Sequence, residues 1–305
     1  GHSAGGGEGG GRSLRGGRPA ILLPGGAEVR QDFSAGGGKA PLGEEKRPFD
    51  AVIFDVDGVL VDVSRSYEQV VKSVVLLFLR LKGRKVDFDH RAFVASAKET
   101  PYFNDDYDLA FVAFHHLATS GRPDLGSWRE RLKAFHGAPT EAELIPLGEE
   151  VGVDYRLFRR TCFEVYFGGE TLEELKGWRQ QVARNRRGFW ELESPLVGFH
   201  HSRVKVPVGL FTGRDRDEVE LALRKLGWQD LDRSRVYALG DGEPKPSPEG
   251  LFRLSRTMGF ENPLYLGDSA SDERALSLFG RGSFVRLRPN GRGETEMALR
   301  DRGLL

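Results

Sequence analysis

Short apolar segments alternate with amphipathic helical patterns from residue 49 onward, and this alternation constrains the fold more than any other feature. A parallel sheet produces such a pattern, because each strand is buried on both faces and a helix connects it to the next strand. The predicted strands are Ala51–Val56, Val206–Thr212, Val236–Leu239, Leu264–Leu266 and Phe284–Leu287. The sequence therefore predicts an α/β fold with helices on both faces of a parallel sheet.

Three helices between the later strands have clear start and stop signals. The first is predicted from the N-cap Asp215, with Glu218 three residues later, to the terminating Gly227. The second is predicted with Ser247 as its N-cap, Pro248 as its first helical residue and Gly259 at its end, and the third is predicted from Asp272 to Gly280.

A long insertion separates the first predicted strand from the second. Roughly 150 residues there have little strand signal, and helical spacing recurs in "SYEQVVKSVVLLFLRLKG", "DLAFVAFHHLA", "DYRLFRRTCFEVYFGG" and "TLEELKGWRQQVARNRRG". We predict a mostly helical domain over 64–194, inserted into a core formed by 49–63 and 195–305. The basic run "RQQVARNRR" is interpreted as a solvated helix face.

The first 48 residues are rich in glycine and have few side chains to bury. We predict a flexible segment, with Ala20–Leu23 as the candidate for a short strand. The segment also has the composition of a linker. Its glycine clusters are not interpreted as phosphate-binding loops, because the residue after the lysine in "GGGK" is Ala40 rather than Ser or Thr.

Composition excludes several classes of function. The 45 basic and 45 acidic residues give a net charge of zero, so nucleic acid is not an expected partner. Cys162 is the single cysteine, which excludes an internal disulfide and is predicted to fill a helix face. No apolar run is long enough for a membrane span or a signal peptide. We expect a cytoplasmic protein, and the sequence leaves its oligomeric state open.

Polar side chains follow the predicted strands at the points where each strand ends. They are Asp55, Asp57, Thr212, Lys245, Asp268 and Asp272. In an open α/β sheet, ligands bind beyond the carboxyl ends of the strands. Carboxylates gathered there repel one another unless a cation neutralises them, and Mg²⁺ prefers oxygen ligands of this kind. The acids are therefore expected to hold a divalent metal next to a phosphoryl group.

Four segments in a fixed order carry a family resemblance: "DVDGV", "TGR", "KPSP" and "GDSASD". The chain resembles the haloacid dehalogenase superfamily, and within it the phosphoglycolate-phosphatase-like enzymes of subfamily IA, whose helical cap is inserted after the first motif. The resemblance implies a Rossmann-like core, a Mg²⁺ cofactor, a small phosphorylated metabolite as substrate, and phosphatase activity through an aspartyl-phosphate intermediate.

The resemblance also implies roles for individual residues. Asp55 would be the nucleophile and Asp57 the general acid and base. The implied metal ligands are Asp55, the backbone carbonyl of Asp57, Asp268 and Asp272, the last through water or by orienting Lys245 instead. The implied phosphate-binding residues are Thr212, Gly213 and Lys245.

Several further residues are candidates without a fixed role. Arg65, Lys98 and Asn104 of the insertion are possible substrate contacts. Arg214 can either contact substrate or pair with acids such as Asp217 or Glu218. The histidine pairs 115–116 and 200–201 are interpreted as structural or exposed, because adjacent residues on a helix do not share a face.

Three alternatives to a phosphatase remain. A 2-haloacid dehalogenase shares the fold but needs neither Asp57 nor the metal. A sugar phosphomutase shares every core motif and differs in protecting the aspartyl-phosphate from water. A non-catalytic binding or regulatory protein would retain the fold alone.

Overall fold

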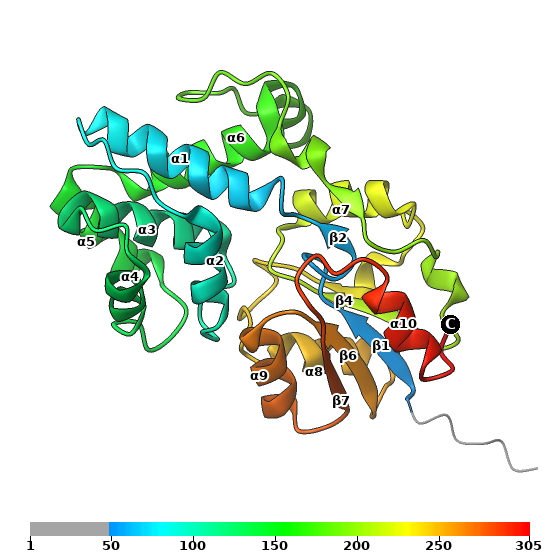
Figure 1. The fold of residues 1–305 in the computed structure, drawn as a ribbon. Helices are drawn as coiled ribbons and strands as arrows, with labels where there is room; N and C mark the ends of the chain where they lie inside the picture. The colour runs from blue at the N-terminus through cyan, green and yellow to red at the C-terminus, as the bar shows by residue number, and fades with distance from the viewer. Residues whose placement is uncertain (1–48) are drawn as a thin grey trace, which may run out of the picture. The chain divides into compact units, whose positions relative to one another are not determined.

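The computed structural model describes residues 49–305, and its centre is a five-stranded parallel sheet in the order β5-β4-β1-β6-β7 (Figure 1). The strands are β1 (Ala51–Phe54), β4 (Val208–Phe211), β5 (Val236–Tyr237), β6 (Pro263–Gly267) and β7 (Ser283–Arg286). All five predicted strands are confirmed, and so is their parallel arrangement. The predictions for the first 48 residues lie outside the described part.

Both faces of the sheet are buried, because alternate residues of β1 belong to two different apolar clusters. Val52 and Phe54 lie in the cluster that includes residues of α7 (Arg216–Leu226) and α10 (Glu294–Arg300). Ala51 and Ile53 lie in the cluster with residues of α8 (Glu249–Met258) and α9 (Ala270–Phe279). The predicted Rossmann-like core with helices on both faces is confirmed.

The insertion is mostly helical, as predicted. Its helices are α1 (Tyr67–Leu81), α2 (His90–Lys98), α3 (Asp106–Ser120), α4 (Leu125–Leu132), α5 (Glu141–Val151) and α6 (Tyr155–Lys176). Helix α1 packs against α3 and α6 through buried aromatic rings, and the Phe78 ring centroid lies 4.7 Å from that of Phe158. Cys162 is buried on α6, as predicted.

A short antiparallel ribbon at the base of the insertion was not predicted. Strand β2 (Val61–Asp62) pairs with β3 (Ser194–Pro195), and the Leu196 N–H donates to the carbonyl of Leu60 at 2.8 Å. Two-residue strands have no periodicity that a sequence pattern can reveal. The ribbon supports our proposal that the cap domain covers residues 64–194.

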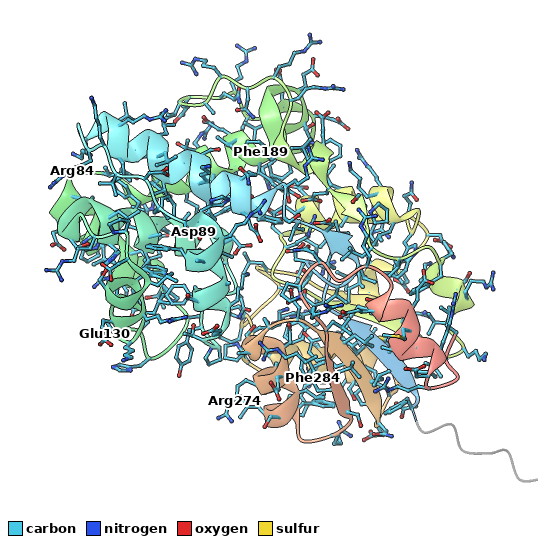
Figure 2. The ribbon with its side chains drawn as sticks, in the orientation of Figure 1. Arg84, Asp89, Glu130, Phe189, Arg274 and Phe284 are labelled. Carbon is cyan, nitrogen blue, oxygen red and sulfur yellow. The ribbon has the colours of Figure 1, made fainter. Side chains whose placement is uncertain are left out.

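Two helix starts differ from the prediction. Ser269 caps α9, so the predicted start at Asp272 was wrong: Asp272 is the third helical residue, and its carboxylate accepts the Ser269 N–H. Helix α8 begins one residue later than predicted, with Pro248 as its N-cap. By contrast, Asp215 does cap α7. Asp89, labelled in Figure 2, lies at the start of α2 and caps it by accepting the Ala92 N–H.

The predicted helix over 171–188 was also wrong beyond Lys176. Gly177 takes the left-handed conformation with φ of 65° and ends α6, so the basic run that follows is an irregular loop. The buried Glu164 carboxylate of α6 fixes this loop by accepting the N–H groups of Gln181, Val182 and Ala183 at 2.7–2.9 Å. A helix over these residues would use the same N–H groups internally.

Glu164→Ala should lower the free energy of unfolding by roughly 2–4 kcal/mol, because it leaves the buried Ala183 N–H and the partly buried N–H groups of Gln181 and Val182 without their acceptor. Chemical denaturation followed by circular dichroism measures the change. Glu173→Ala is the matched control, since Glu173 lies on the same helix with its side chain 64% exposed. Equal small effects of the two substitutions would contradict the structural role of Glu164.

Candidate active site

The carboxyl ends of three adjacent strands bring the predicted residues to one edge of the sheet. Asp55 and Asp57 follow β1, Thr212 follows β4, and Asp268 follows β6. The strands are parallel and β1 lies between the other two, so all of these residues occupy the same end of the sheet. Gly58, with φ of 72°, turns the chain after Asp57, and a Cβ atom there would collide with the Asp268 carboxylate.

Lys245 lies between two buried carboxylates. Its Nζ atom is 2.9 Å from Asp55 Oδ2 and 2.6 Å from Asp272 Oδ1. Burial alone would lower the pKa of Lys245, but the charges of Asp272 and Asp55 outweigh that effect and raise the pKa above its ordinary value. The lysine is therefore a fixed positive charge beside Asp55.

Asp272 is positioned by hydrogen bonds on both of its oxygen atoms. Oδ1 accepts from the Tyr265 hydroxyl and from Lys245, each at 2.6 Å, and Oδ2 accepts from the Ser269 hydroxyl at 2.6 Å. Burial disfavours the charged form, yet Lys245 and these donors hold the pKa of Asp272 below its usual range. This geometry suits a residue that orients Lys245 better than a direct metal ligand.

Lys245 alone does not neutralise the other two acids, Asp55 and Asp268. Burial, with added repulsion from Asp272 and Asp57, raises the pKa of Asp55 to about 7 in spite of Lys245. Burial and repulsion from Asp55 and Asp272 also raise the pKa of Asp268 far above normal. Oxygen atoms of Asp55, Asp268 and Asp272 all lie within 4.8 Å of one another. A buried oxygen cluster with excess negative charge fits a hard divalent cation such as Mg²⁺.

The guanidinium of Arg214 is fully buried and forms an ion pair with Asp57. Its Nε–H donates to Asp57 Oδ1 at 2.6 Å. The other side of the guanidinium donates to Glu193 Oε2 and to the Tyr166 hydroxyl, each at 3.1 Å. The sequence left two roles open for Arg214, a substrate contact or pairing with acids. The structure supports pairing, and the two acids are Asp57 and Glu193.

This Arg214 network connects the core to the cap. Tyr166 belongs to α6, and its hydroxyl donates to Glu193 Oε1 at 2.9 Å. Tyr67, the first residue of α1, stacks on Tyr166 with ring centroids 4.7 Å apart, and the Arg214 guanidinium lies 5.3 Å from its ring centroid. The position of the Asp57 carboxylate therefore depends on residues of two cap helices.

The phosphate-binding candidates lie next to Asp55 and Asp57 in the fold. Thr212 is buried, and its hydroxyl accepts the Arg214 N–H at 3.2 Å. Gly213 lies against the backbone of Asn104, where an added Cβ would be 3.0 Å from the Asn104 carbonyl oxygen. Small size at position 213 thus allows the cap to approach the core closely.

The cap candidates have three different placements. Asn104 bridges cap and core: its side-chain amide donates to the Lys245 carbonyl and accepts from the Ser271 hydroxyl. Lys98 lines the cavity and lies 3.0 Å from Asp106 Oδ1. Arg65 is solvent-exposed and does not line the cavity that contains Asp55 and Asp57.

A cavity of about 480 Å³ lies over the acids, between core and cap. Asp55, Asp57, Lys245 and Asp268 form part of its lining. Sequence reasoning missed other charged lining residues: Glu68, Arg91, Glu99, Asp106, Arg286, Arg288 and Glu294. Arg286 and Arg288 could have been predicted as lining residues, because they lie at the carboxyl end of β7. Nothing in the sequence distinguishes Glu68 from the other acids on amphipathic helices. In the structure, burial raises the pKa of Glu68 to about 7.

Comparison with known proteins identifies the fold. A solved structure, phosphatase Tt82 from Thermococcus thioreducens, is similar with a TM-score of 0.57 and 22% sequence identity, over 83% of this chain and 99% of that one. At this identity the likeness concerns the fold. In the described residues, no helix is both long and apolar enough to cross a membrane.

A curated relative matches over part of its length. Residues of this chain are 26% identical over 232 positions to a protein named imidazoleglycerol-phosphate dehydratase from Phytophthora nicotianae. The match covers 74% of this chain, and the chain spans only 40% of that relative. A family model for haloacid dehalogenase-like hydrolases matches residues 49–280, which include all four motifs and the whole cap. The chain therefore belongs to the haloacid dehalogenase-like hydrolase family.

Proposed function

We propose that this protein is a Mg²⁺-dependent phosphatase that hydrolyses a small phosphomonoester. The observation that carries the proposal is the pair Asp55 and Lys245, a buried carboxylate 2.9 Å from a buried ammonium at the floor of the cavity. Asp57 lines the same cavity, with its side chain 24% exposed. A nucleophile, a fixed positive charge and an accessible acid thus meet at one place, as phosphoryl transfer requires.

The reaction follows from these positions in two displacements. Asp55 attacks phosphorus, the bond from phosphorus to the alcohol oxygen breaks, and Asp57 gives its proton to the departing alcohol. Asp57 then removes a proton from water, the water oxygen attacks phosphorus, and the bond from phosphorus to Asp55 breaks. Inorganic phosphate leaves, Asp55 is free again, and Asp57 holds the proton for the next turnover.

The phosphoryl oxygens need donors and positive charge during both steps. Lys245 supplies a charge beside Asp55, and Thr212 with Gly213 forms the adjoining strand end. Asp55, Asp268 and the backbone carbonyl of Asp57 would hold Mg²⁺, which when bound neutralises negative charge on the acids and on the phosphoryl group. Asp272 would act through its contact with Lys245.

The other candidate functions account for fewer of these features. A haloacid dehalogenase has no use for Asp57 or for a cation. A phosphomutase would use the same groups, and the measurement that distinguishes it is isomerisation of sugar phosphates beside phosphate release. A binding protein needs no buried nucleophile, and Mg²⁺ binding without turnover would identify it.

Asp55→Asn should abolish phosphate release, by about a thousandfold or more, because the amide cannot form the covalent intermediate. The assay measures phosphate from p-nitrophenyl phosphate and from a panel of phosphorylated metabolites with Mg²⁺ present. Asp301→Asn, at an exposed position outside the cavity, is the control and should keep full activity. The proposal fails if the unmodified protein releases no phosphate from any of these compounds.

Asp268→Asn should raise the Mg²⁺ concentration needed for half-maximal activity by roughly tenfold or more, because it removes a charged ligand. Removal of divalent ions with a chelator should stop turnover of the unmodified protein, and added Mg²⁺ should restore it. An unchanged Mg²⁺ dependence of the variant would show that Asp268 is not a ligand.

Arg214→Lys should impair substrates with poor leaving groups most, because a lysine amine cannot contact Asp57, Glu193 and Tyr166 together. An alkyl phosphate depends on protonation by Asp57, whereas p-nitrophenolate leaves without it. We expect kcat for the alkyl phosphate to fall by about tenfold more than kcat for p-nitrophenyl phosphate. Arg216→Lys, with its side chain 48% exposed, is the control. Equal losses on both substrates would mean that Arg214 does not position the acid.

A further inference from the structure

Two adjacent histidines and an aspartate form a second group of potential metal ligands, built from other residues than the catalytic cluster. His200 Nε2 is 2.9 Å from Asp230 Oδ1, and His201 Nε2 is 3.0 Å from the same oxygen atom. One ligand atom from each residue lies within 4.8 Å of the others. Nothing in the phosphatase reaction uses these three side chains.

Adjacent histidines on an α-helix point in different directions and could not share a metal ion. His200 and His201 do not lie on an α-helix. His200 instead has extended backbone, with φ of −85° and ψ of 144°, and precedes the short 3-10 helix η2 (His201–Arg203). The change of backbone conformation between the two residues turns both rings toward Asp230, and their centroids lie 4.3 Å apart.

Contacts behind the rings hold them in place. His200 Nδ1 lies 2.8 Å from the Ser202 hydroxyl and accepts the Ser202 N–H at 3.3 Å. When Nε2 binds an ion, the ring carries its proton on Nδ1, and Nδ1–H donates a hydrogen bond to the Ser202 hydroxyl instead. His201 packs edge-on against Trp228, with centroids 5.6 Å apart. Trp228 is fully buried, and its indole N–H donates to the Phe199 carbonyl at 3.0 Å. The site is therefore largely formed before any ion binds.

We propose that His200, His201 and Asp230 bind one transition-metal ion of the zinc class. Two imidazoles and one carboxylate are typical zinc ligands, and neighbouring ligand atoms around a tetrahedral zinc ion lie about 3.3 Å apart. The observed 2.9 and 3.0 Å need only a slight opening to admit the ion. The Asp230 side chain is 65% exposed, so the ion and a water ligand have access from solvent.

The donor types separate this group from the catalytic cluster. Imidazole nitrogen favours zinc, nickel and copper, whereas the oxygen atoms of Asp55 and Asp268 favour Mg²⁺. The nearby cation Arg233 does not occupy Asp230, because its guanidinium donates to both carboxylate oxygens of Glu220, at 2.6 and 2.8 Å. An ion at this place would join the segment that leads into β4 to the segment that leads into β5.

Calorimetric titration of the full chain with ZnCl₂, in excess Mg²⁺ to occupy the oxygen ligands, tests the proposal. We expect one bound Zn²⁺ per chain, and Asp230→Asn should weaken binding by at least about tenfold while keeping an acceptor for the histidines. His200→Ala should do the same. The control variant combines His2→Ala with His136→Ala and should bind Zn²⁺ as tightly as the unmodified protein. Equal Zn²⁺ affinity of the unmodified protein and Asp230→Asn would overturn the proposal.

Electron paramagnetic resonance of the protein with one equivalent of Cu²⁺ gives a second readout that does not depend on stability. Two coordinated imidazoles should split the signal by two equivalent nitrogen nuclei, and His200→Ala should leave one. A spectrum with only oxygen ligands, or one unchanged by His200→Ala, would mean that the three residues form a hydrogen-bonded group and no metal site. Neither measurement requires phosphatase activity.

Discussion

The buried ion pair of Lys245 with Asp55 and Asp272 is the constraint on which the rest of the site depends. Asp55 after β1, Asp268 after β6 and Asp272 on α9 cannot all stay charged in a protein interior without compensating charge. Lys245 lies less than 3 Å from two of them, Asp55 and Asp272, but supplies only one positive charge. Burial and repulsion from Asp55 and Asp272 raise the pKa of Asp268 far above its ordinary value, although Lys98 and Lys245 partly oppose the rise. The fold thus accepts an electrostatic cost that a bound divalent cation would offset.

The sequence predicted the sheet and the acids because their signals are local. A buried strand, a following acid and a glycine occur within a few residues, as in "AVIFDVDGV". The same local signals failed where a distant partner decides the structure. The loop after Gly177 is fixed by the Glu164 carboxylate, more than a dozen positions earlier, and no periodicity in "RQQVARNRR" reveals that contact.

The interactions around Asp57 could not be predicted for the same reason. Arg214 was recognised as a residue that pairs with acids, but its neighbours in sequence, Asp217 and Glu218, were the expected partners. Its side chain instead reaches Asp57 and Glu193, which are 157 and 21 positions away. An arginine next to several acids can pair with any of them, and only the packed cap selects the partners.

The Arg214 network also gives the cap a role beyond covering the cavity. Arg214 is held by Tyr166 of α6 and by Glu193 near the base of the cap, and the same guanidinium orients Asp57. Asn104 also connects the cap to the carbonyl of Lys245, whose ammonium pairs with Asp55. If the cap moves, Asp57 loses part of the support for its position. In the proposed reaction, the alignment of Asp57 with the leaving group would therefore depend on the position of the cap.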